Sequence, residues 1–214
     1  IKSLEQQDGI RHKVDTDAIA QWWQQIDSWR DAHGLYTKNR YEDGNGLIKP
    51  QHVVELLHEL TEGQAYVTSD VGQHQMFAAL YYPFAKPRRW INSGGLGTMG
   101  FGLPAAMGVQ MAHPEAISTV VTGDGSIQMN IQELEILKRR NLPIKIFVLN
   151  NHNLGMVRQF QELYFEKRYE GTLVDYSVPS FEKIAHAYGL AGHQISSADE
   201  NIEKSISTLM ADDQ

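Results

Sequence analysis

Two short and almost continuously apolar runs, Ile117–Thr122 and Ile144–Leu149, constrain the fold more than any other feature of the chain. Such runs are typical of parallel strands that are buried on both faces. A helix-like stretch separates them, so the order predicts a βαβ unit. The first run ends at Asp124, which lies between two glycines, and the second ends at Asn150-Asn151. Because parallel strands end at one sheet edge, we expect Asp124 and Asn151 to converge.

The types of these residues predict the kind of ligand. Asp124 and Asn151 offer hard oxygen atoms, which suit Mg²⁺ or Ca²⁺ better than zinc. Mg²⁺ usually completes its shell with water and with substrate phosphates, so the site also predicts a phosphorylated ligand. Gly123 and Gly125 favour the same ligand, because backbone without a Cβ atom can approach a phosphate closely. The helix that follows would direct free N–H groups to the same place.

The remaining patterns predict an α/β domain with three layers: an open, mostly parallel sheet with helices on both faces. For the helix between the two apolar runs we expect Asn130 at the N-cap, Glu133 at N3 and Pro143 beyond the end. The other expected elements are a strand at Ala65–Val71, a helix at Met76–Tyr82, a helix at Phe181–Tyr188, a short strand at Gly192–Ile195 and a helix at Asp199–Met210.

Composition excludes several classes of protein. The net charge of −7 argues against a nucleic-acid surface. The absence of cysteine excludes disulfides and thiolate metal sites, and it fits a reducing compartment. No apolar run approaches the length of a membrane span, and the N-terminus lacks a signal-peptide pattern, so we expect no membrane partner. Ile1 in place of methionine suggests that the sequence begins inside a longer polypeptide.

Residues 1–45 differ from the rest. Ile19, Trp22, Trp23, Ile26 and Trp29 have helical spacing, after a cap at Asp15 or Thr16 and before Gly34. We expect one amphipathic helix whose tryptophans pack on a neighbouring domain. A polar linker, Tyr41–Gly46, follows, and Pro50 then opens a helix that runs to about Leu60. We place the domain boundary between residues 45 and 46.

Four stretches carry a resemblance to a known family. GDG followed by NN resembles the metal and diphosphate motif of thiamine-diphosphate enzymes. Three neighbouring stretches resemble the catalytic large subunit of acetohydroxyacid synthase, also called acetolactate synthase: Val71–Met76 (VGQHQM), Trp90–Ala106 (WINSGGLGTMGFGLPAA) and Asn150–Gln161 (NNHNLGMVRQFQ). The resemblance covers roughly Gly46 to the C-terminus, and it implies the thiamine-diphosphate-binding fold for residues 46–214.

The resemblance implies a set of site residues. The metal ligands would be Asp124, Asn151 and the backbone carbonyl of Asn153. The cofactor-binding residues would be Gly72, Gln73, His74, Met99, Gly123, Asp124, Gly125, Ser126, Asn151, Asn153, Gly155 and Met156. His152 is expected to be an exposed loop residue. Phe160 would lie near the substrate entrance, where many relatives carry tryptophan, and this departure leaves the response to inhibitors open.

Local alternatives stay open for several of these residues. His74 could simply cap a helix, although its strand-to-helix turn also suits an anion. Met99 could fill a gap in the core, or it could support the bent cofactor as the resemblance implies. Gly95, Gly97 and Gly100 also match the G-x-G-x-x-G of dinucleotide-binding turns, with Asp124 as the acid. Residues 161–176 are polar and aromatic, and they fit a mobile lid or an interface.

The implied activity is that of the whole family. The parent enzyme would decarboxylate pyruvate and join the remaining two-carbon unit to a second pyruvate or to 2-oxobutyrate, in branched-chain amino-acid biosynthesis. The cofactors would be thiamine diphosphate and Mg²⁺, with FAD in the intact enzyme but not in this chain. The activating glutamate is expected upstream of Ile1, so no catalytic residue is assigned here. Alternatives are another thiamine-diphosphate-dependent decarboxylase or oxidase, and a non-catalytic nucleotide-binding module.

The family also implies partners and a compartment. We expect a homodimer or a higher homo-oligomer, and a regulatory small subunit is a possible partner. The compartment would be the cytoplasm of a bacterium, or an organelle if the source is eukaryotic.

Overall fold

Two compact units, residues 1–43 and 44–214, make up the chain in the computed structural model, and each is treated by itself. The structure describes residues 15–33, 47–172, 178–196 and 201–211. The predicted linker Tyr41–Gly46 lies outside these ranges, as do Gly34 and Asp199.

The described part of the first unit is one helix, α1 (Thr16–His33), as predicted. The Asp15 carboxylate caps it, because Oδ1 accepts hydrogen bonds from the backbone N–H groups of Asp17 (3.1 Å) and Ala18 (2.9 Å). No residue of α1 is buried. Trp22 and Trp29 pack edge to face, with ring centroids 5.7 Å apart, yet both stay about half exposed. That these tryptophans pack on a neighbouring domain stays a prediction.

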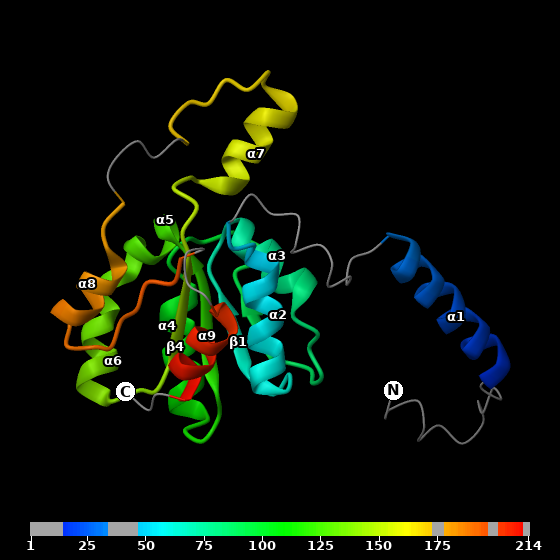
Figure 1. Cartoon of the computed structure of the whole chain (residues 1–214), viewed down its shortest axis with the longest axis horizontal. Coiled ribbons are helices and arrows are strands. Elements are labelled where there is room, and N and C mark those ends of the chain that lie inside the picture. The colour runs from blue at the N-terminus through cyan, green and yellow to red at the C-terminus, as the bar shows by residue number, and fades with distance from the viewer. Residues whose placement is uncertain (1–14, 34–46, 173–177, 197–200, 212–214) are drawn as a thin grey trace. The chain divides into compact units, whose positions relative to one another are not determined.

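The second unit is built on a sheet in which every strand pair is parallel (Figure 1). The strand order is β2 (Trp90–Asn92), β1 (Tyr66–Ser69), β3 (Ser118–Gly123) and β4 (Lys145–Leu149). All six residues of β3 are buried, as the prediction of a strand covered on both faces requires, although Ser118, Thr119 and Thr122 are polar. This arrangement confirms the α/β class and the βαβ unit.

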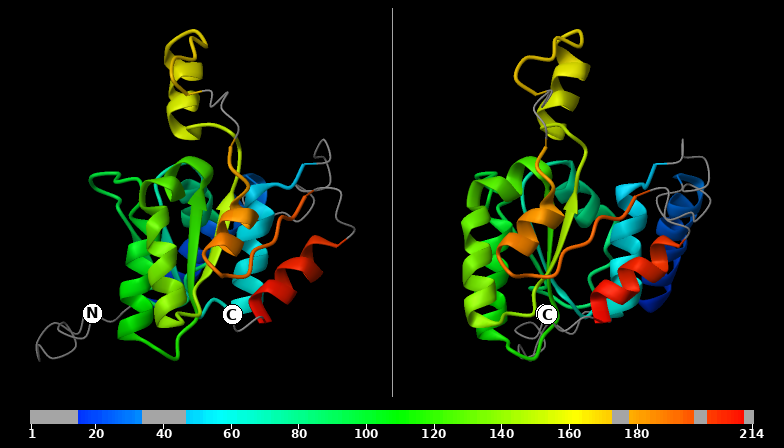
Figure 2. Two further views of the ribbon diagram at one scale, coloured as in Figure 1. Left: turned by 90° about the vertical axis from the view of Figure 1, so that its left-hand side faces the viewer. Right: turned by 60° about the vertical axis from the view of Figure 1, so that its left-hand side comes forward.

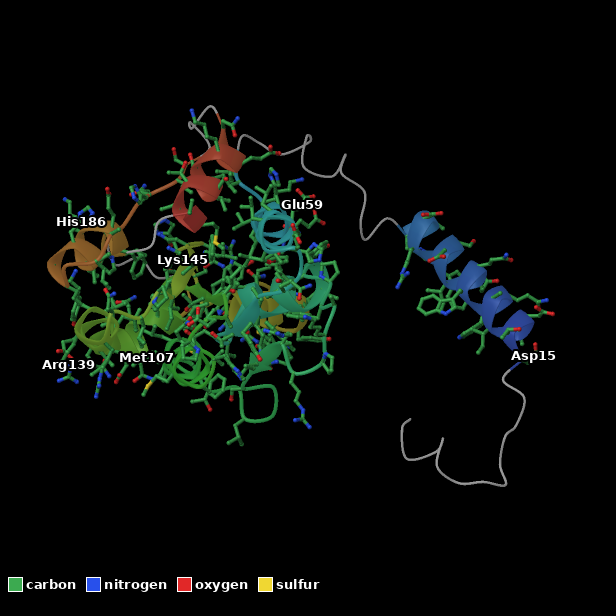
Figure 3. The ribbon with its side chains drawn as sticks, turned by 90° about the horizontal axis from the view of Figure 1, so that it is seen from below. Asp15, Glu59, Met107, Arg139, Lys145 and His186 are labelled. Carbon is green, nitrogen blue, oxygen red and sulfur yellow. The ribbon has the colours of Figure 1, made fainter. Side chains whose placement is uncertain are left out.

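Helices cover both faces of the sheet, which gives the three layers that the sequence predicts. One face carries α2 (Pro50–Thr61), α3 (Gln73–Tyr81) and α9 (Ile202–Ala211), and the other carries α4 (Gly102–Ala112), α6 (Leu134–Arg140) and α8 (Phe181–Ala187). Figure 3 shows α4 with Met107 and α6 with Arg139 on one side and α2 with Glu59 on the other. A hydrophobic core lies on each face of the sheet, and successive residues of β3 point into opposite cores. Val120 packs with α4, and Val121 packs with α2 and α3.

The connection from β3 to α6 differs from the prediction. A short helix, α5 (Asp124–Ile127), begins at Asp124 itself, and a 3₁₀ segment, η2 (Gln128–Glu133), follows it. Asn130 is not the N-cap of α6. It has a non-helical backbone (φ −135°, ψ 33°), and its side-chain amide donates to the carbonyl oxygen of Gly100 at 2.7 Å. Glu133 occupies the N-cap position of α6 rather than N3.

Two other expectations need correction. The short strand predicted at Gly192–Ile195 does not form, and described residues 191–196 contain no strand. A Cβ atom on Gly192 would lie 2.8 Å from the Cβ atom of Ala185, so this segment packs on α8 instead of pairing with β4. Strand β2 was not expected, because its three residues are too few to show a pattern. The predicted strand at Ala65–Val71 is the shorter β1.

A buried carboxylate joins three elements just beyond β1. Asp70 is fully buried. Its Oδ1 accepts from the backbone N–H of Gly102 at 3.0 Å, and its Oδ2 accepts from the Thr122 hydroxyl at 2.8 Å. Asp70 therefore ties the end of β1 to the end of β3 and to the first residue of α4.

We expect Asp70→Ala to lower the free energy of unfolding by about 3 kcal/mol, because it leaves two buried donors without an acceptor. Urea unfolding followed by circular dichroism measures the change. Glu135→Ala is the matched control: its carboxylate is exposed and pairs with Arg139 at 3.5 Å, so a change within about 0.5 kcal/mol is expected. Equal effects of the two substitutions would contradict the joining role of Asp70.

Candidate functional site

The predicted site residues lie at the carboxyl edge of the sheet. Three helices begin at this edge, namely α3 at Gln73, α5 at Asp124 and α7 (Gly155–Tyr164) at Gly155. In the sheet register Gly123 of β3 is the partner of Leu149 of β4, so the residues after these two strands start side by side. The α7 helix stands out from the rest of its unit (Figures 1 and 2).

His74 fills the space between two turns of this edge. A Cβ atom added to Gly123 would lie 2.7 Å from His74 Nδ1, and one added to Gly72 would lie 2.8 Å from the same atom. Neither glycine can therefore accept a side chain without moving the imidazole. The sequence motifs around residues 72–74 and 123–125 belong to one packed cluster.

The environment of His74 keeps its imidazole neutral. Burial lowers the pKa of His74 from 6.5 to about 4, and a hydrogen bond to the backbone of Asp70 opposes this shift. Its Nε2 atom is buried and has no hydrogen-bond partner. A buried nitrogen without a partner is uncommon, and the His74 ring lies beside the turns at Gly72 and Gly123, where an anion is expected. The expectation that His74 only caps a helix is not supported by any cap hydrogen bond from this side chain.

Asp124 is the buried carboxylate of the site, with 2% of its surface exposed. Burial raises the pKa of its carboxyl group, while hydrogen bonds from its own backbone and from the backbones of Asn151 and Gly125, together with the charge of His152, oppose the rise. Its Oδ2 atom is buried without a partner. An ionised oxygen in this condition costs free energy unless a cation or a donor reaches it.

The loop after β4 supplies further oxygen atoms. Asn151 Oδ1 accepts from the backbone N–H of Asn153 at 3.0 Å, and the Asn153 amide donates to the Asn151 carbonyl at 2.6 Å. The Oδ1 atom of Asn153 is buried without a partner. His152 is exposed and has a positive φ of 56°, which agrees with the predicted loop role.

Met99 and the start of α7 lie beside the cluster formed by the turns at residues 72–74 and 123–125. A Cβ atom on Gly125 would lie 3.0 Å from Leu154 Cδ2 and 3.7 Å from Met99 Cε, so Met99 reaches the Asp124 turn. Ser126 donates its hydroxyl to the carbonyl oxygen of Val71 at 2.8 Å. Gly155 is buried at the start of α7, whereas Met156 is 40% exposed.

The loop Gly95–Gly100 follows β2 and precedes α4, as a dinucleotide-binding turn would. Its glycines serve the path and packing of the chain, however. Gly97 and Gly100 have positive φ values of 64° and 88°, and a Cβ atom on Gly100 would lie 2.8 Å from the Cβ atom of Met129. Asp124 is buried in its own turn, where it accepts hydrogen bonds from that turn and from the Asn151 backbone, whereas the acid of a dinucleotide site is free to bind a ribose.

The donor set fits a hard cation that brings its own phosphates. One carboxylate, one side-chain amide and one backbone carbonyl lie on two adjacent turns, and the unpartnered Asp124 Oδ2 is the atom that a cation would satisfy. Among the described residues no group of three histidine, cysteine or acidic residues could hold a metal. The three oxygens offered by Asp124, Asn151 and Asn153 are by themselves too few for an octahedral shell.

One contact of the site was not predicted. Gln159 of α7 accepts a hydrogen bond from the side-chain amide of Gln73 at 3.1 Å. No sequence signal singles out this glutamine, because its partner lies on a different element far along the chain.

Comparison with known proteins agrees with this geometry. The family model of thiamine pyrophosphate enzymes, C-terminal TPP binding domain, matches residues 70–214. The chain belongs to this family. Thiamine pyrophosphate is another name for thiamine diphosphate, a cofactor that carries the kind of anion expected at the sheet edge. The family also accounts for the site better than a dinucleotide does.

Within this family, the chain is similar to acetolactate synthase large subunits. The chain is 52% identical over 194 residues to the acetolactate synthase large subunit of Haemophilus influenzae, covering 91% of this chain and 32% of the relative. It is 58% identical over 184 residues to the acetolactate synthase isozyme 3 large subunit of Escherichia coli, covering 86% and 31%. The chain thus spans about a third of the length of these relatives. None of the helices in the described ranges has the length and hydropathy to span a membrane.

The depressed pKa of His74 predicts a pH dependence of stability. The unfolded chain binds a proton at His74 below pH 6.5, whereas the folded chain resists protonation down to about pH 4. The contribution of His74 is therefore complete above pH 6.5 and is lost as the pH falls toward 4, at a total of about 3 kcal/mol. Urea unfolding between these pH values should show a smaller loss in His74→Gln than in the unmodified chain. His186→Gln, at an exposed histidine of α8, should keep the full loss.

Asp124→Ala should abolish the coupled binding of Mg²⁺ and thiamine diphosphate, with a loss of affinity of at least about a hundredfold, because it removes the charged ligand of the cation. Titration calorimetry of each component in the presence and absence of the other measures the coupling. The variant should stay folded, since the buried carboxylate is costly without a cation. Intact Mg²⁺-dependent binding in this variant would show that the site is wrongly placed.

Proposed function

We propose that residues 46–214 bind the diphosphate of thiamine diphosphate through Mg²⁺ and form the C-terminal part of an acetolactate synthase large subunit. The observation that carries the proposal is the meeting of Asp124, with its unpartnered buried Oδ2, and the Asn151 loop at one sheet edge. The identity to the named large subunits, 52% and 58%, supports this particular member of the family. Residues 1–45 would then be the tail of a preceding domain and its linker.

Each part of the site has a separate task in this proposal. Asp124, Asn151 and the carbonyl of Asn153 would hold the cation. The turns at Gly72 and Gly123 would bring backbone N–H groups close to the diphosphate, because neither carries a side chain. His74 Nε2 is buried and without a partner, and it would donate to a phosphate oxygen once the bound diphosphate has raised the pKa of His74 enough to protonate the ring.

The outer part of the site would orient the rest of the cofactor. Met99 reaches the turn at Gly125, where it would support the bent form of the cofactor. When bound, thiamine diphosphate supplies the electron sink for decarboxylating a 2-keto acid and for forming a carbon–carbon bond. The protein would contribute binding, orientation and exclusion of water.

The proposal also covers the substrates, the pathway, the flavin, the protein partners and the compartment of the whole enzyme. The substrates would be pyruvate and 2-oxobutyrate, and the pathway would lead to branched-chain amino acids. FAD would belong to the intact enzyme and to residues before this chain. A homo-oligomer and a regulatory small subunit are the proposed protein partners, and the bacterial relatives favour the cytoplasm. The exposed aromatic side chains of Tyr164 and Phe165 would belong to a lid or an interface, and the exposed Phe160 would lie near the substrate entrance.

A chimera tests the function directly. The matched 184 residues of the Escherichia coli isozyme 3 large subunit are replaced by those of this chain, and the purified chimera receives pyruvate, Mg²⁺ and thiamine diphosphate. The proposal requires acetolactate as the product, and no product when the chimera carries Asp124→Ala. Release of acetaldehyde or acetate by a folded, cofactor-loaded chimera would instead favour another thiamine-diphosphate-dependent decarboxylase or oxidase.

The chain alone should form no acetolactate under the same conditions. Activation of the cofactor needs a carboxylic acid near its aminopyrimidine ring, and the carboxylates after the site do not supply it: Glu133 lies at the N-cap position of α6, and Glu135 is exposed beside Arg139. Binding should also be weak, because phosphate contacts alone must offset the cost of ordering the cofactor. A turnover on the order of 10 per second would show that a complete catalytic site exists within this chain.

A further inference from the structure

Three side-chain amides form one line of hydrogen bonds from α7 to the proposed metal loop. Asn151 donates its Nδ2 to Gln73 Oε1 at 3.3 Å, and Gln73 donates its Nε2 to Gln159 Oε1 at 3.1 Å. The three residues come from the loop after β4, the start of α3 and the second turn of α7. A line of this kind connects the orientation of each amide to that of the next.

The line has a direction. A side-chain amide has a donating NH₂ end and an accepting oxygen end. Because Gln159 accepts, Gln73 turns its NH₂ toward α7 and its oxygen toward Asn151. Asn151 in turn uses its NH₂ for Gln73, which leaves its Oδ1 at the opposite end. That oxygen is the atom proposed to bind the cation, and a flipped amide would present an NH₂ group instead.

The start of α7 packs directly against this line. A Cβ atom on Gly155 would lie 2.8 Å from Asn151 Nδ2 and closer still to Gln73 Oε1. Gly155 is buried, so the amides have no room to exchange partners by moving toward α7. The other end of the Asn151 amide is held only from within its own exposed loop, by the Asn153 N–H at 3.0 Å.

We propose that Gln159 is a positioning residue for the metal site, acting through Gln73 to keep Oδ1 of Asn151 directed at the cation. The proposal rests on the proposed function, since it assumes that Mg²⁺ binds at Asn151. It gives Gln73 a role beyond contact with the diphosphate. It also makes the placement of α7 a condition for tight binding of the metal, because Gln159 reaches Gln73 only while α7 packs at this edge.

Substitutions at Gln159 separate the hydrogen bond from the shape of the side chain. Gln159→Glu keeps an acceptor, whereas Gln159→Leu removes it. Leucine, glutamate and glutamine have similar helix propensities, so α7 itself should be unaffected. The matched control is Glu162→Leu, which puts the same side chain on the same helix at an exposed position that pairs only with Lys167, at 3.7 Å.

The first measurement is calorimetric titration of Mg²⁺ into the 214-residue chain at saturating thiamine diphosphate. We expect Gln159→Leu to weaken Mg²⁺ binding about tenfold, as outer-shell substitutions commonly do. Gln159→Glu and Glu162→Leu should stay within about twofold of the unmodified chain. The titrations are repeated at high salt, where the added charge of Gln159→Glu is screened.

The second measurement needs no ligand. The side-chain NH₂ signals of Gln73 and Asn151 are followed by nitrogen-15 NMR in the same four proteins. Gln159→Leu should shift or broaden both pairs of signals, and the other two variants should leave the Asn151 pair in place. These signals report on the amide line itself, independently of any binding.

The outcomes distinguish this proposal from the proposed function. If the unmodified chain binds no Mg²⁺ with thiamine diphosphate, the proposed function fails and the positioning role fails with it. If the unmodified chain binds both but Gln159→Leu binds Mg²⁺ equally well, the positioning role alone is overturned. Equal loss in Gln159→Leu and Gln159→Glu would also overturn it, because an acceptor at residue 159 would then have no effect.

Discussion

Parallel pairing of β3 with β1 on one side and β4 on the other is the interaction on which the site depends. Parallel strands all end at one edge, so the residues that follow them meet although they are far apart in sequence. Here the edge collects His74, Asp124 and Asn151 from three separate turns. Asp70 reinforces the arrangement, since its two carboxylate oxygens bind the end of β3 and the start of α4.

Close packing at this edge explains where the glycines stand. The space beside Gly123 is filled by the His74 ring, and the space beside Gly155 is filled by the amides of Gln73 and Asn151. These glycines are thus matched to side chains on other elements. A substitution there would disturb the binding groups themselves, which makes the motifs more restrictive than their turn geometry alone would require.

The sequence predicted the two strands that carry the candidate site better than it predicted the connections around them. The two apolar runs identify β3 and β4, but only β3 is buried on both faces; β4 is the last strand of the sheet and its residues are partly exposed. A three-residue strand such as β2 is too short to show a hydrophobic pattern in the sequence. The strand predicted at Gly192–Ile195 does not form, because Gly192 packs on α8 instead. Asn130 has the side chain of an N-cap, yet tertiary contact with Gly100 uses its amide. Gln159 could not be found, because a long-range hydrogen bond leaves no local signature.

The carboxyl edge of the sheet contains buried polar atoms that have no hydrogen-bond partner in the free chain. Asp124 Oδ2, Asn153 Oδ1 and His74 Nε2 are all buried without partners, although buried polar atoms normally find them. One lone atom could be a local cost of folding, but three at one sheet edge have a common remedy. A cation would satisfy the Asp124 carboxylate, and a phosphate bound to that cation would favour the protonated His74 ring and accept a hydrogen bond from it. The free energy that these unpartnered atoms cost the free chain would be recovered if the metal and the diphosphate bound together, so we expect their binding to be coupled.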